Sequence, residues 1–227
     1  IMAIVGKLLS SWKGKLIITE HAVMSAKKIE HKGEFVIGQM PFFAKIFYKY
    51  ADALVGVSNG VIHDLQTVIK LSVPSMSCIP NPVNIDLIRS QANEYPCPHN
   101  WLGKAIPCFV YVGRLAKQKN LSLLLNCFCE VTKKIEAKLL IIGDGELKHE
   151  LINEVKSYKL GNVVEILGHQ NNPYSYIKNA NCFVLTSREE AFGLVLVEAL
   201  ALNTPIVAVD AIGSGPREVL DNGKYGD

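Results

Sequence analysis

The sequence lacks several features that would place it in well-marked classes. None of its six cysteines forms a Cys-x-x-Cys pair, so we interpret them as reduced core residues rather than redox or metal-binding groups. No apolar run reaches the ~20 residues that span a bilayer. No secretory signal precedes the first expected strand. These absences together predict a cytoplasmic protein.

The 227 residues suffice for one large core or two modest ones, and the net charge of +3 is unevenly spread. Residues 1–49 hold 8 Lys/Arg against 3 Asp/Glu, whereas residues 101–227 hold 14 of each. A basic face of this kind suits anionic lipid or phosphate better than it suits a nucleic-acid-binding domain, with a merely solvated surface as the alternative. We therefore expect no nucleic acid partner.

After residue 100, short apolar runs rich in β-branched residues alternate with amphipathic stretches. Each run is almost entirely apolar, which indicates strands buried on both faces of a parallel sheet with helices on each side. The pattern predicts a doubly wound α/β domain over residues 99–227. Its expected strands are 109–113, 138–143, 163–168, 182–187 and 205–210, and its expected helices are 121–135, 146–160, 173–179, 194–202 and 215–220.

Residues 1–98 show the same alternation only in part. Strands are expected at 16–20 and 53–58 and a helix at 60–71, which amounts to half of a similar domain. The polar, proline-bearing stretch 81–98 is predicted to be a linker between the two domains. The chain opens inside an apolar segment and stops in a turn-like sequence, so we expect truncation at both ends.

A cluster of cations follows the first strand of the later domain. Gly113 and Arg114 stand at the end of that strand, and Lys119 lies at the start of the next helix. A glycine lets the backbone approach a phosphate closely, and Arg and Lys supply the cations that a diphosphate needs. Taken alone, the cluster fits a solvated turn about equally well.

The strand at 182–187 leads into a helix in which Glu198 is the single charge. An unpaired carboxylate in so apolar a setting would cost several kcal/mol, so Glu198 is expected to accept hydrogen bonds. A ribose diol offers two suitable donors, and a core glutamate satisfied by the protein is the alternative. The N–H groups of Gly193 and Leu194, at the start of this helix, suit phosphate oxygens.

Two further candidates lie where strands end. Glu190, in the loop before the Glu198 helix, can reach sugar hydroxyls, or it can simply stabilise the start of that helix. His21 follows the strand at 16–20 and can face the same cleft from the other domain. For a lone histidine, an ordinary surface or core position is the more common explanation.

Arg114 and Lys119, with the pair Glu190 and Glu198, resemble the retaining glycosyltransferases of the family-4 type. The resemblance covers nearly the whole chain. After Ile-Pro-Asn, Pro82 stands where that family usually has Gly, which leaves the hinge geometry open. Five ordered motifs carry the resemblance: Ile-Pro-Asn at 79–81, Val-Gly-Arg-Leu at 112–115, Ile-Ile-Gly-Asp-Gly at 141–145, Glu-Ala-Phe-Gly-Leu-Val at 190–195 and Thr-Pro-Ile-Val-Ala at 204–208.

This resemblance implies a GT-B architecture, with two Rossmann-like doubly wound domains of which the N-terminal one, on the acceptor side, is incomplete here. It implies that Arg114 and Lys119 hold a diphosphate leaving group, Glu198 the ribose and Glu190 the transferred sugar, with His21 at the reacting centre. No metal and no cofactor is implied, because the cations and the helix terminus stabilise the leaving group of a nucleotide-diphosphate sugar, the co-substrate.

The segment 213–219 is similar to members that act in bacterial lipopolysaccharide, capsule or lipid-linked oligosaccharide assembly, many with UDP-sugars. This implies transfer of a hexose or N-acetylhexosamine, with retention, to a glycan or lipid-linked acceptor. The aromatic, lysine-bearing stretch 41–50 can lie on an inner-leaflet membrane surface, making the protein peripheral there. An ordinary helix packed on its sheet is the alternative.

Two other interpretations stay open. A sugar-nucleotide epimerase of the same fold would keep the donor site but need further acid and base groups. A donor-binding fragment would bind the nucleotide sugar without turnover. A dinucleotide-binding dehydrogenase is disfavoured, because the Gly-Asp-Gly at 143–145 lacks the third glycine and follows the second strand of its domain rather than the first.

Overall fold

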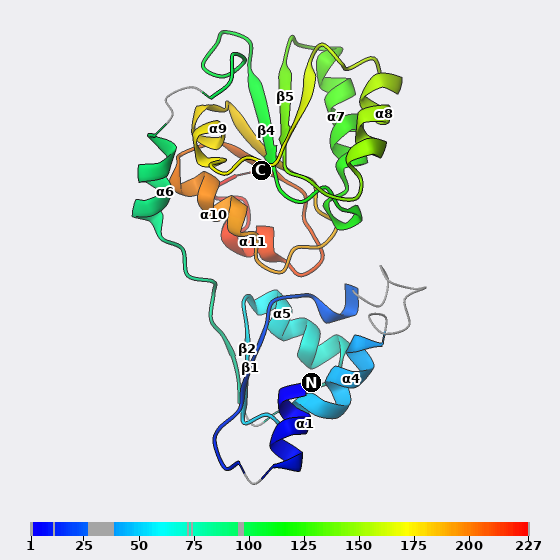
Figure 1. Ribbon diagram of the computed structural model, residues 1–227, viewed down its shortest axis with the longest axis vertical. Coiled ribbons are helices and arrows are strands. Elements are labelled where there is room, and N and C mark those ends of the chain that lie inside the picture. The colour runs from blue at the N-terminus through cyan, green and yellow to red at the C-terminus, as the bar shows by residue number, and fades with distance from the viewer. Residues whose placement is uncertain are drawn as a thin grey trace. The chain divides into compact units, whose positions relative to one another are not determined.

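A computed structural model describes residues 2–10, 12–26, 39–71, 73, 75–94 and 98–226 of the chain (Figure 1). The chain forms two compact units. Unit 1 comprises residues 1–81, 189–192 and 211–218, and unit 2 comprises residues 82–188, 193–210 and 219–227. Two short segments of the later chain therefore fold with the earlier one.

The described part of unit 2 is built on one parallel five-stranded sheet, in the order β6-β5-β4-β7-β8. At its centre, Val110 is paired with Leu140 on one side and Phe183 on the other. This is the doubly wound arrangement that the alternating pattern predicts. The strands are β4 (Cys108–Val112), β5 (Lys138–Ile142), β6 (Val164–Gly168), β7 (Cys182–Leu185) and β8 (Ile206–Ala208).

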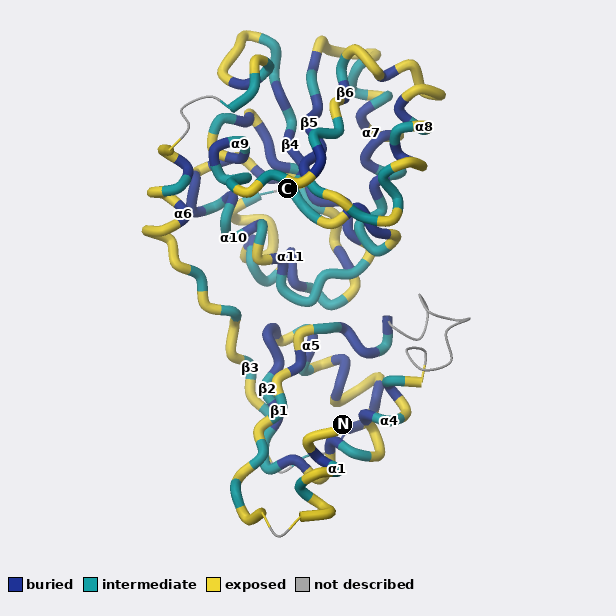
Figure 2. The backbone as a smooth tube through the Cα atoms, in the orientation of Figure 1, coloured by how far each residue is buried: buried dark blue, intermediate teal, exposed yellow. Residues whose placement is uncertain are grey.

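The helices of unit 2 form two groups on opposite sides of the strands (Figure 1). One group is α7 with α8, and the other is α6 with α9 and α10. Coverage on both faces explains why the central strands are mostly apolar, and many of their residues are buried, dark blue positions in Figure 2. The helices are α6 (Ile85–Ala92), α7 (Leu121–Thr132), α8 (Lys148–Ser157), α9 (Tyr174–Asn179) and α10 (Leu194–Ala201); α11 (Gly215–Val219) begins in unit 1.

The predicted linker at 81–98 contains the helix α6, which belongs to unit 2. Asn84 caps it, with its side chain accepting a hydrogen bond from the N–H of Leu87 at 3.0 Å. Ile88 is buried, and the Arg89 Nε donates to the carbonyl of Ala201 at 3.0 Å. The units therefore divide after residue 81 rather than at the predicted 98/99 boundary, because α6 packs on unit 2.

Among the described residues of unit 1, three parallel strands form a sheet in the order β1-β2-β3. Leu54 on β2 and Leu65 share its core with Ile4, Ala44 and Tyr48. The strands are β1 (Ile17–Glu20), β2 (Ala53–Gly56) and β3 (Met76–Cys78); the helices are α1 (Met2–Leu9), α4 (Met40–Phe47) and α5 (Asn59–His63), which continues as a π-helical turn, Asp64–Val68.

The strands β4 and β5 approach each other closely at their carboxyl ends. The N–H of Gly113 donates to the carbonyl of Ile142 at 3.0 Å. A Cβ atom on Gly143 would lie 1.9 Å from the carbonyl oxygen of Gly113, and the φ of Gly143 is +143°. Only glycine fits this position without displacing backbone.

We predict that Gly143→Ala lowers the free energy of unfolding of unit 2 by at least about 2 kcal/mol, because it adds backbone strain and a steric clash. Urea unfolding followed by circular dichroism measures the change. Gly161→Ala is the matched control, since a Cβ there meets no atom within 4 Å. Equal midpoints for the two variants would contradict the prediction.

Candidate functional site

The order of the strands in unit 2 places a switch point between β4 and β7. From β4 the chain proceeds to β5 and β6 toward one edge of the sheet. From β7 it proceeds to β8 toward the opposite edge. In sheets of this kind ligands bind outside the carboxyl ends of the strands at the point where the order reverses. The candidate donor residues follow β4 and β7.

A pocket of about 340 Å³ opens at the carboxyl ends of β4 and β5. This volume lies within the range of small-molecule sites, roughly 300–1,000 Å³. Arg114 is exposed at its edge, and its guanidinium has no hydrogen-bond or ion-pair partner among the described residues, so it is available to an anion. The lining residues are Val112, Gly113, Arg114, Ile142, Gly143, Asp144, His169, Gln170 and Pro173.

The loops after β4 and β5 hold each other in place around this pocket. The N–H of Leu115 donates to the carbonyl of Asp144 at 2.9 Å, and the N–H of Leu147 donates to the carbonyl of Leu115 at 3.0 Å. The hydrogen bond from Lys148, with that from the N–H of Gly145, lowers the pKa of the Asp144 carboxyl. Asp144 is thus committed to Lys148 and is not a free negative charge facing Arg114.

Lys119 lies at the end of a 3₁₀ turn, Lys117–Lys119, that joins the loop after β4 to the loop after β7. Its carbonyl accepts the hydroxyl of Thr186 at 3.0 Å. The carbonyl of Gln118 accepts the N–H of Arg188 at 2.8 Å. These bonds bring the predicted cationic loop and the start of the β7 loop together within unit 2.

The amino end of α10 is open to a ligand. Gly193 precedes the helix with φ 89° and ψ 57°, a left-handed conformation that favours glycine. Leu194, the first helical residue, is 44% exposed. The N–H groups of Leu194 and Val195 have no acceptor within the first helical turn, and they have none elsewhere in the described chain. They suit an anionic group.

Glu198 is half-buried on α10, and hydrogen bonds compensate only poorly for the burial of its carboxylate. Burial raises the pKa of its carboxyl, and a hydrogen bond from the Tyr174 hydroxyl lowers it in part. That hydroxyl lies 3.5 Å from the carboxylate oxygen, which is long for an O–H···O bond. The carboxylate has no other partner in the described part of the chain, so it is not a core group fully satisfied by the protein.

His21 and Glu190 belong to unit 1, whereas Gly113, Arg114, Lys119, Gly193, Leu194 and Glu198 belong to unit 2. The Glu190 N–H donates to the carbonyl of Ile212 at 2.9 Å, and its carbonyl accepts the N–H of Gly215 at 3.1 Å. A Cβ on Gly213 would lie 2.3 Å from Val23 and 2.9 Å from the Glu190 carbonyl oxygen. The Glu190 segment and the chain just after His21 are therefore neighbours within unit 1.

Glu20 is a residue whose role the sequence does not indicate. Its buried carboxylate accepts hydrogen bonds from the N–H groups of His21 at 3.2 Å and Ala22 at 3.1 Å, and from the Tyr48 hydroxyl at 2.9 Å. Burial and the neighbouring Glu20 raise the pKa of Tyr48. Glu20 thus fixes the turn that presents His21, whose side chain is exposed.

Sequence reasoning also misses three residues of the candidate site. The pocket is lined by His169 and Gln170, and the hydroxyl of Tyr174 donates to the Glu198 carboxylate. Tyr174 follows a proline at the start of a short helix, where an aromatic residue usually packs into a core. His169 and Gln170 follow β6, so the rule that ligands sit beyond strand ends was the one signal that could have identified them.

Comparisons with known proteins show what this chain is similar to. The family "Glycosyl transferases group 1" matches residues 103–226, which is 124 of the 227 residues. An uncharacterized glycosyltransferase of Methanocaldococcus jannaschii is 36% identical over 179 residues, covering 78% of this chain and 44% of that protein. The Campylobacter jejuni "N-acetylgalactosamine-N,N'-diacetylbacillosaminyl-diphospho-undecaprenol 4-alpha-N-acetylgalactosaminyltransferase" is 29% identical over 214 residues, covering 94% of this chain and 56% of that protein.

The fold has solved counterparts. The crystal structure of Anabaena HepE in complex with UDP and glucose superposes with a TM-score of 0.73 at 21% identity, covering 93% of this chain and 56% of that one. The α/β fold with parallel sheets is thus that of GT-B glycosyltransferases. The chain spans about half the length of the curated relatives it matches. Because the family match extends over more than half of its residues, the chain belongs to the glycosyl transferases of group 1.

Proposed function

We propose that the chain carries the donor site of an enzyme that moves a hexose or N-acetylhexosamine from a UDP-sugar to a glycan or lipid-linked acceptor, with retention. One observation carries the proposal. In unit 2 the Arg114 guanidinium, unpartnered among the described residues, the open amino end of α10 and the poorly compensated Glu198 all follow strand ends at the switch point of the sheet. A nucleoside diphosphate would supply a phosphate anion to the guanidinium and the N–H groups, and a ribose diol to the carboxylate.

The names of the relatives support the choice of donor and acceptor. The HepE structure contains UDP and glucose, and the Campylobacter relative is named for transfer of N-acetylgalactosamine to a diphospho-undecaprenol glycan. A poly(glycerol-phosphate) alpha-glucosyltransferase of Bacillus subtilis is 38% identical over 118 residues. These names favour UDP as the carrier and a polymer or lipid-linked glycan as the acceptor.

In the proposed reaction, the bond between the sugar C1 and the β-phosphate oxygen breaks, and a bond from C1 to the acceptor oxygen forms on the same face. The acceptor hydroxyl loses its proton to the departing phosphate. Arg114, Lys119 and the N–H groups of α10 stabilise the negative charge that develops on the diphosphate, so the proposal requires no metal ion or cofactor. Glu190 holds hydroxyls of the transferred sugar, and His21 lies at the reacting centre.

Thermal unfolding with a nucleotide panel tests the donor site. UDP should raise the melting temperature more than GDP or ADP does. Arg114→Ala should weaken UDP binding about 10- to 100-fold but leave uridine binding unchanged, because it removes a charge-assisted bond to phosphate. Glu198→Gln should weaken UDP and uridine binding alike, because it removes the acceptor for the ribose.

The Glu198→Gln variant also has an expected pH signature in the absence of ligand. A raised carboxyl pKa in the folded state means that stability falls as pH rises through the range between the ordinary value and the folded value. Glutamine removes this loss, so the variant should melt higher than the wild type at neutral pH and equally at acidic pH. Lys104→Ala, at an exposed site, is the control. A Glu198→Gln variant that melts lower at neutral pH would count against the proposed role.

Turnover should depend on Glu190. We expect Glu190→Gln to keep UDP affinity within about threefold of the wild type while lowering the rate of UDP-sugar hydrolysis or transfer at least tenfold, since its contact is with the sugar. Release of UDP, measured with a coupled assay in the presence of EDTA, gives the rate. Epimerised sugar nucleotide without UDP release would indicate the epimerase instead. Binding without either product would indicate a donor-binding fragment.

A membrane surface is the second part of the proposal. Within the part of the chain that the structure describes, no helix is long and apolar enough to cross a membrane. Along α4 and the following turn, Phe42, Ile46 and Tyr50 are 58%, 38% and 45% exposed and stand four residues apart, with Lys45 and Lys49 exposed beside them. Apolar side chains flanked by cations suit an interface rich in anionic lipid.

Charge reversal at this face should weaken membrane binding. The double variant Lys45→Glu/Lys49→Glu should reduce co-sedimentation with phosphatidylglycerol vesicles at least tenfold, because each lysine near an anionic surface contributes about 1 kcal/mol. Lys104→Glu/Lys134→Glu carries the same charge change on exposed sites of unit 2 and should bind as the wild type does. Equal binding of both variants, or equal binding to phosphatidylcholine, would refute the surface.

A further inference from the structure

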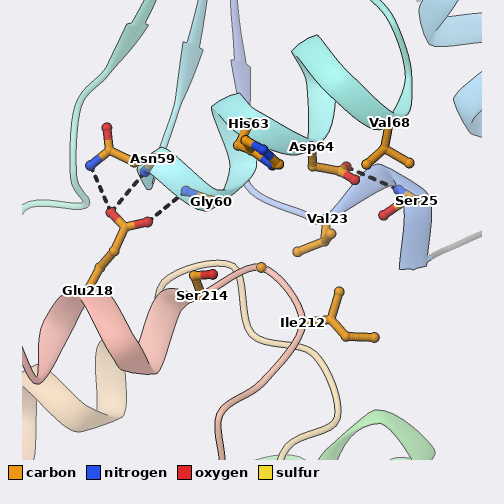
Figure 3. A pocket seen from close by; sticks show the side chains of 11 residues that line it. Val23, Ser25, Asn59, Gly60, His63, Asp64, Val68, Ile212, Ser214 and Glu218 are labelled. Atoms are coloured by element: carbon orange, nitrogen blue, oxygen red, sulfur yellow. Dashed lines mark hydrogen bonds between the residues drawn. The ribbon is translucent and has the colours of Figure 1, made fainter. Parts of the chain in front are cut away.

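Unit 1 contains a pocket of about 470 Å³ that is bordered by two carboxylates, Asp64 and Glu218 (Figure 3). Asp64 is 5% exposed and accepts a hydrogen bond from the N–H of Ser25 at 3.1 Å. Glu218 accepts three, from the N–H of Asn59 at 2.9 Å, from Asn59 Nδ2 at 3.0 Å and from the N–H of Gly60 at 2.6 Å. Figure 3 shows Glu218 reaching from its own helix to the start of α5.

Glu218 completes the amino end of α5. The first N–H groups of a helix have no acceptor inside the helix and need one from outside it. The side chain of Ser58, the residue before α5, accepts the N–H of Val61 at 3.2 Å. The N–H groups of Asn59 and Gly60 donate instead to the Glu218 carboxylate, whose negative charge also suits the positive end of the helix dipole. Charge-assisted hydrogen bonds thus hold the segment that carries Glu218 on α5.

The backbone of the same segment, residues 211–218, packs directly on the first turn of α5. A Cβ atom on Gly60 would lie 1.9 Å from the carbonyl oxygen of Gly213. This distance leaves no room for a side chain at residue 60, so the two backbones are in contact. The segment is therefore fixed on α5 at two points, by the glycine contact and by the Glu218 carboxylate.

The same segment also holds the backbone of Glu190. The Glu190 N–H donates to the carbonyl of Ile212 at 2.9 Å, and the N–H of Gly215 donates to the Glu190 carbonyl at 3.1 Å. A Cβ on Gly215 would lie 2.5 Å from that carbonyl oxygen and 2.7 Å from the nitrogen of Phe192. Through its N–H and its carbonyl, Glu190 is thus bonded to a segment that Glu218 anchors.

We propose that Glu218 is a positioning residue: its hydrogen bonds to α5 fix residues 211–218 and, through them, the place of the Glu190 side chain. Glu218 itself contacts neither the sugar nor the diphosphate. The pocket of unit 2 that Arg114 borders plays no part in this anchoring, so UDP affinity is independent of Glu218. This inference rests on the proposed function, because Glu190 has a task at the transferred sugar only in a glycosyltransferase.

The kinetic test compares Glu218→Ala with Ser58→Ala, since both remove a cap of α5 but only the first detaches residues 211–218. Glu218→Ala should lower the kcat of UDP release at least about tenfold and keep the Kd for UDP within about threefold of the wild type. Ser58→Ala, the matched control, should lower the melting temperature but keep kcat within about threefold. Glu218→Gln keeps one acceptor oxygen, so its kcat should lie between those of the wild type and Glu218→Ala.

A double-mutant cycle with Glu190→Gln separates positioning from a general loss of stability. If Glu218 acts through Glu190, adding Glu218→Ala to Glu190→Gln should lower kcat by less than about twofold more, because the contact that Glu218 positions is already lost. Effects that multiply independently would overturn the inference. So would a wild-type kcat for Glu218→Ala, or equal losses of kcat in Glu218→Ala and Ser58→Ala.

Hydrogen exchange of the Glu190 and Gly215 N–H groups, followed by NMR, needs no turnover and so separates this inference from the proposed function. Glu218→Ala should speed exchange of both at least about tenfold, and Ser58→Ala should not. If exchange rises in this way but UDP-sugar is never turned over, the activity is wrong and the anchoring by Glu218 stands. If UDP-sugar turns over and Glu218→Ala matches the wild type in exchange and in kcat, the activity stands and this inference is wrong.

Discussion

The candidate site of unit 2 depends on how closely β4 and β5 approach at their carboxyl ends. There the carbonyl of Gly113 occupies the space where a side chain on residue 143 would lie. Hydrogen bonds between Leu115 and Asp144, and between Leu147 and Leu115, then join the two loops that follow. Because this frame is made of backbone, Arg114 projects from a fixed loop without needing a protein carboxylate to orient it.

The two pockets carry complementary chemistry. The pocket of unit 2 has a guanidinium without a partner among the described residues, and the start of α10, after β7, offers unpaired N–H groups. The pocket of unit 1 has carboxylates and no Lys or Arg among its described residues. An anionic ligand would be favoured at the pocket of unit 2 and disfavoured by the carboxylates of the pocket of unit 1, since like charges repel.

The sequence pattern locates strands and helices most accurately where their residues are uniformly buried. The five strands of unit 2 are mostly apolar, so the pattern locates each to within about three residues, and Glu198 stands out as the one charge in its helix. The strand β3 and the helices α1 and α6 were missed, because β3 has three residues and α6 buries few positions. Asp64 gave no signal either, since its isolation results from how the chain after β1 packs on α5, which no local pattern encodes.

Four carboxylates of this chain differ in how fully the fold satisfies them. Glu20 and Glu218 each accept three hydrogen bonds from donors fixed by the fold. Asp64 accepts one, and Glu198 accepts one across 3.5 Å. Asp64 and Glu198 keep oxygens that are not sealed in the interior, since the fully buried side-chain oxygens without a partner among the described residues are those of Glu154 and Ser175. Because a poorly paired carboxylate in a partly buried setting is costly, a hydroxyl donor that reached either group would be stabilising.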